Sequence, residues 1–107
     1  MVINQYNIFW VDLNPNVGHE IKKVRPCTVI SPNEMNSNID TVIIAPITTK
    51  SRNYPTRIKI VFNKKTGWIV LDQIRTIDKI RLKEKAGYLR DAEIIKVKDI
   101  LKEMLVD

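Results

Sequence analysis

The sequence predicts a mainly β, α+β fold: a small, strongly curved barrel of about five to seven strands, closed by a C-terminal α-helix. Three observations carry this prediction. Short runs of β-branched and aromatic residues alternate with turn-forming stretches along most of the chain. Sustained helical periodicity occurs at the C-terminal end. The 107 residues, 44% of them hydrophobic and one of them Cys, suit a single disulfide-free domain over residues 1–107.

The first half of the chain contains three predicted strands, at residues 8–13, 27–31 and 41–47. Polar stretches separate them, and we expect loops at 14–24 and 34–40. Pro46 comes near the end of the third strand. Because proline has no amide hydrogen for a ladder, its position predicts a sheet edge or a bulge there.

The second half begins with a predicted hairpin. Residues 56–62 alternate between two faces, residues 67–74 form the next strand, and residues 63–67 are the turn between them. We expect a further short strand at 75–78 and a helical turn at 80–85.

The C-terminal segment predicts one amphipathic helix, with Asp91 placed to cap its N-terminus. Apolar residues recur there at three- and four-residue spacing, at Ile94, Val97, Ile100 or Leu101, and Met104 or Leu105. This single apolar stripe would pack against the sheet.

The net charge of +6 is concentrated in the middle of the chain. Residues 41–90 carry twelve cations against three acids, a net of +9, whereas residues 1–40 carry −1 and residues 91–107 carry −2. A block this basic indicates a polyanion or an acidic protein as the partner. A solvated basic surface is the alternative that composition leaves open.

The residues present exclude several classes of site. The chain contains no P-loop, GxGxxG, HExxH or GxSxG pattern. With one histidine and one cysteine, it cannot supply a histidine pair for acid–base catalysis or a Cys-rich zinc site. We therefore expect no metal ion and no cofactor. His19, in a polar loop, is interpreted as an ordinary exposed residue.

Membrane and secretory segments are not expected. No apolar stretch is long enough to span a bilayer, and the N-terminus lacks the basic and apolar regions of a signal peptide. The sequence therefore predicts a cytoplasmic protein that does not associate with membranes.

Arg25 is the most informative candidate for a binding residue. It precedes Pro26, which holds its backbone extended and places its side chain at the root of a strand. A guanidinium held there suits bidentate contact with a phosphate. Pairing with a carboxylate is an equal alternative.

A second cluster follows the third strand and combines hydroxyls with cations, at Thr48, Thr49, Lys50, Ser51 and Arg52. Such a cluster can hold a phosphate. Its alternative is a hydrogen-bonded turn with solvated charges.

The cysteine and the aromatic residues have structural interpretations. Cys27 lies in an apolar run and is expected to be a small buried hydrophobe rather than a nucleophile. Trp10 and Trp68 are expected in the core or in an interface. Tyr54, in a basic loop, could stack on a base or pack within the protein.

Six short motifs occur in a specific order along the chain. FWVDLNP at residues 9–15 is followed by GHE at 18–20, VRP at 24–26, APITT at 45–49, YPT at 54–56 and LDQIRTID at 71–78. In this combination and order, the chain resembles the MazF/PemK family of toxin endoribonucleases of type II toxin–antitoxin systems.

The resemblance implies an SH3-like barrel that forms a homodimer and cleaves single-stranded RNA, including mRNA, at specific sequences without a metal ion. The ribose 2′-OH would attack the adjacent phosphate, leaving a 2′,3′-cyclic phosphate and a 5′-OH. The family's catalytic residues fall on Arg25, Thr48 and Glu20. Such a reaction needs a positioned phosphate and stabilised charge but no protein nucleophile, which fits the residues present.

RNA binding is expected at six further residues: Lys50, Ser51, Arg57, Lys59, Gln73 and Arg75. Of these, Lys50, Arg57 and Lys59 would contact flanking phosphates without reading sequence. The loops at 14–24 and 49–55 would read bases splayed from the single strand.

The resemblance also implies a partner, an acidic MazE-like antitoxin whose disordered tail would wrap the basic middle of the chain. Two other functions stay open. One is a non-enzymatic toxin resembling the CcdB gyrase poisons, which share the fold and would not need Arg25 or Thr48. The other is a regulator that binds RNA and leaves it intact.

Overall fold

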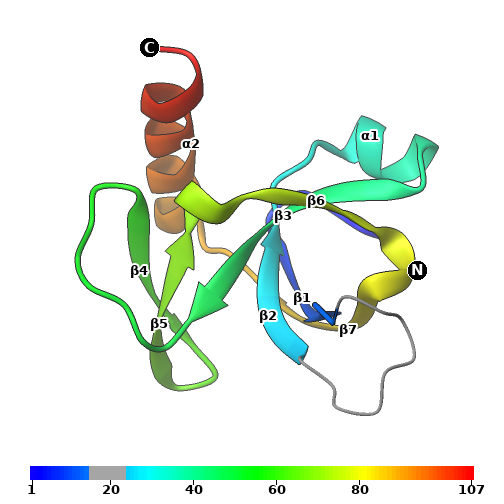
Figure 1. Ribbon diagram of the computed structural model, residues 1–107, viewed down its shortest axis with the longest axis horizontal. Coiled ribbons are helices and arrows are strands. Elements are labelled where there is room, and N and C mark those ends of the chain that lie inside the picture. The colour runs from blue at the N-terminus through cyan, green and yellow to red at the C-terminus, as the bar shows by residue number, and fades with distance from the viewer. Residues whose placement is uncertain (15–23) are drawn as a thin grey trace.

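The computed structural model describes residues 1–14 and 24–107 (Figure 1). These residues form seven β-strands in one sheet of order β4-β5-β3-β2-β1-β7, with β6 paired to β3. The sheet curls into a half-barrel, and the C-terminal helix lies beside β4 and β5. The predicted mainly β fold with a C-terminal helix is confirmed.

The strands are β1 (Asn7–Asp12), β2 (Val24–Val29), β3 (Thr41–Thr48), β4 (Arg57–Phe62), β5 (Lys65–Val70), β6 (Arg75–Asp78) and β7 (Leu82–Tyr88). The α-helices are α1 (Asn33–Asn38) and α2 (Asp91–Leu105), and two short 3₁₀ helices are η1 (Leu71–Gln73) and η2 (Lys79–Arg81).

The central strand β3 changes its partner halfway along its length. One edge pairs with β2, whereas the other pairs with β6 over Thr41–Ile44 and with β5 at Ile47–Thr48. Pro46 lies in the gap between those two partners. Among the described strands, none pairs with this side of β3 at Pro46, so the proline lies at a local edge, as expected for a residue without an amide hydrogen.

Buried apolar residues gather in two clusters. The first joins β3, β4 and β5 to α2 and contains Ile47, Ile58, Ile69 and Val97. The second lies among β1, β2, β3 and β6 and includes Phe9. Each fully buried aliphatic side chain contributes about 1.5–3 kcal/mol. The predicted apolar stripe of α2 is confirmed, with fully buried Val97 at its centre.

The β4–β5 hairpin turns at Asn63 and Lys64, whose φ angles are 51° and 62°. Positive φ at both central residues is what the type I′ turn, which is common in two-residue hairpins, requires. The turn expected over 63–67 is therefore too long. Gly67 lies within β5, where a Cβ atom would come 3.1 Å from Ile47 Cγ2, so this glycine marks close packing between strands rather than a turn.

The loop expected at 34–40 is wrong, because most of this segment forms α1. Its Asn36 is buried, and the side-chain Nδ2 donates to the Ser31 carbonyl at 2.9 Å. The Ser31 hydroxyl donates to Asn36 Oδ1 and accepts the backbone N–H of Ile43 at 3.0 Å. A polar segment can be ordered in this way when its buried groups are all paired.

Two other segments differ from expectation. The strand expected to run through 67–74 ends at Val70, and η1 follows it. The helical turn expected at 80–85 is limited to η2, after which β7 pairs with β1. The sequence of β7 is rich in charged residues and lacks the alternation of apolar and polar residues that is typical of a strand. Its pairing with β1 could therefore not be predicted from this segment alone.

The expected strand at 75–78 is confirmed as β6. The cap of α2 is one residue earlier than expected. Asp91 is the first helical residue, and the backbone N–H of Arg90 donates to Glu93 Oε1 at 2.8 Å. An acidic side chain in the first turn accepts a hydrogen bond from a free N–H group, and its negative charge interacts favourably with the helix dipole.

Candidate functional site

The site begins where β2 and β3 stop pairing. Their ladder runs from Val29 to Cys27, and Cys27 lies opposite Pro46 in the last pair. Neither Pro26 nor Pro46 has an amide hydrogen, so donors that could extend the hydrogen-bonded ladder are missing here. Beyond this point the two strands separate, and each presents a polar side chain.

Those two side chains are Arg25 and Thr48, which line the same two cavities. The smaller cavity, of about 190 Å³, is lined by Arg25, Thr48, Lys50, Arg57 and Gln73 together with two apolar residues. The larger cavity, of about 430 Å³, shares Arg25, Thr48 and Lys50 with it. The structure thus brings five of the nine residues expected from the sequence to one place.

Arg25 is exposed at the start of β2. Among the residues that the structure describes, its guanidinium pairs with no carboxylate. Of the two interpretations left open for Arg25, the described part of the chain therefore favours an anion-binding group over a partner of a protein carboxylate.

Thr48 forms a local hydrogen-bonded turn. Its hydroxyl accepts the backbone N–H of Lys50 at 3.2 Å and lies 3.4 Å from the Lys50 carbonyl, to which it donates. These long contacts hold the hydroxyl at the cavity wall and can be exchanged for a ligand oxygen. The turn that sequence analysis left as an alternative is therefore formed, and it positions the hydroxyl.

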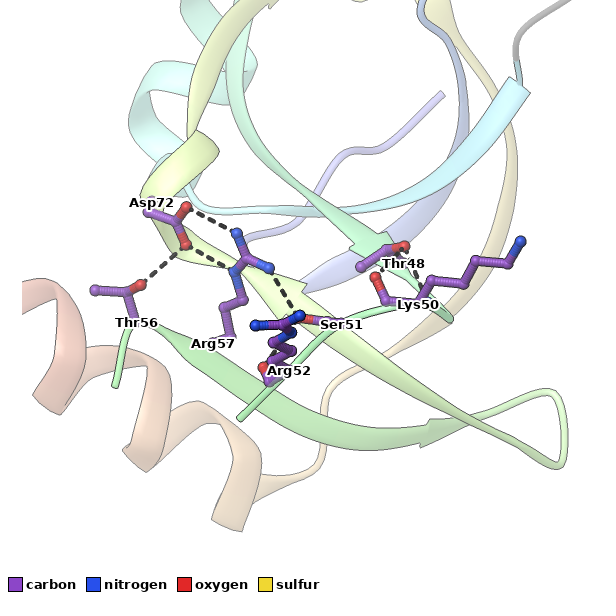
Figure 2. Close-up of polar contacts among 7 residues, drawn as sticks. All are labelled: Thr48, Lys50, Ser51, Arg52, Thr56, Arg57 and Asp72. Atoms are coloured by element: carbon purple, nitrogen blue, oxygen red, sulfur yellow. Dashed lines mark hydrogen bonds and ion pairs between the residues drawn. The ribbon is translucent and has the colours of Figure 1, made fainter. Parts of the chain in front are cut away.

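Arg57 is held by an ion pair (Figure 2). Its Nε and Nη2 donate to the two carboxylate oxygens of Asp72, each at 3.3 Å, and its Nη1 donates to Ser51 Oγ at 2.9 Å. Thr56 Oγ1 also donates to Asp72, at 2.9 Å. The hydrogen bond from Arg57 is the main reason that the pKa of the Asp72 carboxyl is lowered.

The contacts of Arg57 favour a structural role for its side chain. The guanidinium carbon also lies 4.9 Å from the centre of the Tyr54 ring, so one face of Tyr54 packs on a cation. All three guanidinium nitrogens of Arg57 have protein partners. Its side chain is 21% exposed, so Arg57 is better placed to fix the segment before β4 than to meet a phosphate freely.

The other expected residues lie elsewhere. Lys59 lines a separate cavity of about 600 Å³ with Trp68 and residues of α2. Ser51 is in the segment before β4, where its hydroxyl accepts a hydrogen bond from Arg57. Arg75 is exposed on β6, outside these cavities. Glu20 and His19 lie outside the described residues.

Cys27 is completely buried in the second apolar cluster, as expected. Burial raises the pKa of its thiol to about 12, although the nearby charges of Arg75 and Arg25 oppose this. At neutral pH the thiol is protonated and shielded from solvent, which excludes it as a nucleophile.

The wall of the larger cavity was not expected from the sequence. Trp10 and Phe62 line it, as do Asn63, Lys65 and Thr66 at the hairpin tip. Trp10 was expected in the core or in an interface; it is partly exposed, and its ring centroid lies 6.1 Å from that of Phe62. These residues belong to distant segments, and the polar turn predicted over 63–67 was the signal that could have drawn attention to the hairpin tip.

Two negative findings concern the described ranges 1–14 and 24–107. No three His, Cys, Asp or Glu side chains gather there in a way that could hold a metal ion. No helix in the same ranges combines the length and apolar character needed to cross a membrane.

The arrangement has a definite chemical capacity. The Arg25 guanidinium, which has no carboxylate partner among the described residues, meets the Thr48 hydroxyl and the cation of Lys50 at one pair of cavities. These groups can hold a phosphate and stabilise added negative charge on it. A reaction on a phosphodiester in which the substrate supplies the nucleophile would suit this set.

Sequence relatives point in the same direction. Residues 4–105 match a family model described as PemK-like, MazF-like toxin of type II toxin–antitoxin system. The chain is 37% identical over 106 residues to a protein named Endoribonuclease MazF from Staphylococcus epidermidis, with 94% of this chain and 88% of that protein covered.

Solved structures share the fold. One is an endoribonuclease in complex with its cognate antitoxin from a mycobacterial species, with a TM-score of 0.80 and 23% identity over 95% of this chain and 93% of that one. Another is MazF from Deinococcus radiodurans, with a TM-score of 0.81 and 23% identity over 98% of this chain and 97% of that one. Both similarities concern the fold.

Proposed function

The chain belongs to the PemK-like, MazF-like toxins of type II toxin–antitoxin systems and is an endoribonuclease of that family, and we propose that it cleaves single-stranded mRNA at the Arg25–Thr48 site. The observation that carries the choice of site is that Arg25 and Thr48 line the same two cavities. Residues 1–107 act as one toxin domain in this proposal.

The proposed reaction is an internal transesterification. The 2′-OH of one ribose attacks the adjacent phosphorus and forms the new P–O2′ bond, and the P–O5′ bond breaks. The 2′-OH loses its proton, and the departing 5′ oxygen gains one. The products are a 2′,3′-cyclic phosphate and a 5′-OH, and no metal ion or other cofactor takes part.

Arg25 has the principal role in this mechanism. Negative charge builds on the non-bridging oxygens of the phosphorane, and a guanidinium offers charged donors to two of them at once. The role proposed for Arg25 is therefore stabilisation of the charge that develops on the phosphate. The absence of a carboxylate partner among the described residues leaves its donors available.

Thr48 and Glu20 complete the proposed catalytic set. The Thr48 hydroxyl exchanges its long contacts with Lys50 for a hydrogen bond to the phosphate. Glu20 is assigned to the set from the family motif, and it lies outside the described residues.

The RNA strand is proposed to follow the basic surface around this site. Lys50 and Gln73 reach the catalytic cavities directly, and Lys59 and Arg75 contact the strand further away. Ser51 and Arg57 act mainly through each other, because the charge of Arg57 is balanced by Asp72.

The partners and the location are proposed from the family to which the chain belongs. A homodimer in the cytoplasm, neutralised by an acidic MazE-like antitoxin, is the proposed state. The concentration of positive charge in residues 41–90 suits an acidic antitoxin segment. Toxicity that persists when the toxin is co-expressed with the acidic protein encoded beside it would overturn this pairing.

The product ends test the proposed chemistry. RNA cleaved by the purified protein is expected to carry 2′,3′-cyclic phosphate and 5′-OH ends, which are identified by enzymatic end-labelling with and without prior phosphatase. Fragments with 5′-phosphate ends would show that water or a protein group, rather than the 2′-OH, attacks the phosphorus.

A further inference from the structure

The larger cavity beside Arg25 and Thr48 has walls that the cleavage chemistry does not require. Its volume of about 430 Å³ falls in the range of small-molecule sites, about 300–1,000 Å³. It extends from the start of β2 to the tip of the β4–β5 hairpin, and it shares Arg25, Thr48 and Lys50 with the smaller cavity. A group bound in it would be the direct neighbour of a phosphate held by Arg25.

Two aromatic side chains supply the apolar part of the wall. Trp10 comes from β1 and Phe62 from the end of β4, and their ring planes are inclined at 60°. Both residues are partly buried, so each keeps some ring surface open. Unpaired RNA bases are commonly held by stacking on aromatic side chains of this kind.

The hairpin tip supplies the polar part of the wall. Asn63, Lys65 and Thr66 line the cavity. In the described ranges 1–14 and 24–107, the Asn63 amide and the Thr66 hydroxyl have no hydrogen-bond partner. A carboxamide carries both donors and an acceptor, so it can distinguish bases by their hydrogen-bonding pattern. The tight turn fixes where that amide stands.

We propose that this cavity is a nucleobase subsite, an inference that rests on the endoribonuclease function above. The base beside the cleaved phosphate lies against Trp10 and Phe62, and the Asn63 amide reads its edge. Lys65 contacts the phosphate that follows. The β4–β5 hairpin tip is therefore a specificity determinant, in addition to the loops at 14–24 and 49–55.

The test compares cleavage preferences on a pool of single-stranded RNA with randomised sequence, read by sequencing the new 5′ ends. The variant Asn63→Gly removes the amide and tolerates the positive φ of that position. The preference of this variant for one base, at the RNA position next to the cleaved bond, is expected to fall on the order of 10-fold or more. Its base preferences at the other RNA positions are expected to stay unchanged. Lys64→Gly is the matched control, because Lys64 is in the same turn but does not line the cavity.

A second variant tests the aromatic wall. Phe62→Leu keeps an apolar side chain but removes the ring, and KM for an RNA of the preferred sequence is expected to rise roughly 5-fold or more with kcat retained. If the wild-type protein cleaves RNA with a sequence preference that Asn63→Gly leaves intact, and Phe62→Leu leaves KM intact, the subsite is wrong and the endoribonuclease function stands. If the wild-type protein cleaves no RNA in the pool, the function itself fails and the subsite fails with it.

Discussion

Arg57 and Asp72 form a two-point ion pair in which Nε and Nη2 of the guanidinium each donate, at 3.3 Å, to a different carboxylate oxygen. The pair joins the start of β4 to η1 at the edge of the smaller cavity. It neutralises a cation that sequence analysis assigned to RNA. Arg25 and Lys50 are left as the cavity's cations without a carboxylate partner among the described residues.

This ion pair predicts a contribution to stability that depends on pH. The pKa of Asp72 is lowered in the folded protein, mainly by Arg57, so the contribution is complete above the pKa of an unfolded aspartate, about 3.9. It is lost as the pH falls through the lower, folded-state value. Because the pair is partly exposed, we expect Asp72→Asn to lower the free energy of unfolding by up to about 1 kcal/mol at pH 7.

Urea denaturation of wild type and Asp72→Asn at neutral and acidic pH measures this effect. The stability difference between the two proteins is expected to shrink as the pH falls, because the wild-type carboxyl becomes neutral as well. A difference that stays constant down to the lowest pH at which both proteins fold would contradict the assignment.

The Thr48 hydroxyl is expected to matter for cleavage and little for folding. Thr48→Val keeps the shape of the side chain and removes the hydrogen-bonding oxygen at the cavity wall. Loss of one such group from a transition state typically costs about 10²-fold or more in kcat. Single-turnover cleavage of a labelled RNA measures the loss, with Thr76→Val on exposed β6 as the matched control. Equal rates for the two variants would remove Thr48 from the mechanism.

Much of the proposed catalytic pair, Arg25 and Thr48, could be predicted from sequence because its placement depends on local rules. Pro26 places Arg25 at the root of a strand, and Thr48 ends the next strand in the sheet. Antiparallel pairing of neighbouring strands then brings the two together without any further information. The curled sheet and α2 were predictable for the same reason, since apolar periodicity along the chain reports which face is buried.

The remaining features depend on contacts between distant segments. Arg57 and Asp72 are brought together across the β4–β5 hairpin. The sequence does not show that these two charges will neutralise each other in an ion pair. Trp10 and Phe62 meet only through the curl of the sheet. Asn36 can be buried because Ser31 satisfies its amide. The polar composition of residues 34–40 alone favours a loop.

The pairing between Asn36 and Ser31 predicts a loss of stability on mutation. Asn36→Ala leaves the Ser31 hydroxyl and carbonyl without these partners in a buried place, which typically costs about 1–3 kcal/mol. Urea denaturation measures the change in the free energy of unfolding. Asn38→Ala, an exposed position on the same helix, is the control and should change stability much less. A similar effect of the two substitutions would show that the buried pair does not anchor α1.

The hairpin turn predicts a gain in stability. Lys64 has a φ of 62°, a conformation that costs most side chains about 1–2 kcal/mol and costs glycine almost nothing. Because glycine also makes the unfolded chain more flexible, the net gain from Lys64→Gly should be up to about 1 kcal/mol. Thermal unfolding followed by circular dichroism should show a higher Tm. A lower Tm would mean that the Lys64 side chain makes a stabilising contact that outweighs the backbone strain.

Cleavage of single-stranded RNA by wild type and Arg25→Ala in the presence of EDTA shows whether Arg25 supports a metal-independent reaction. Wild type is expected to cleave without a divalent metal, and Arg25→Ala is expected to lose about 10²–10³-fold in rate while unfolding at the same urea concentration. Arg25 is exposed at the start of β2, so its replacement should leave the fold intact. An Arg25→Ala protein that cleaves as fast as wild type, or a wild-type activity that EDTA abolishes, would contradict the account.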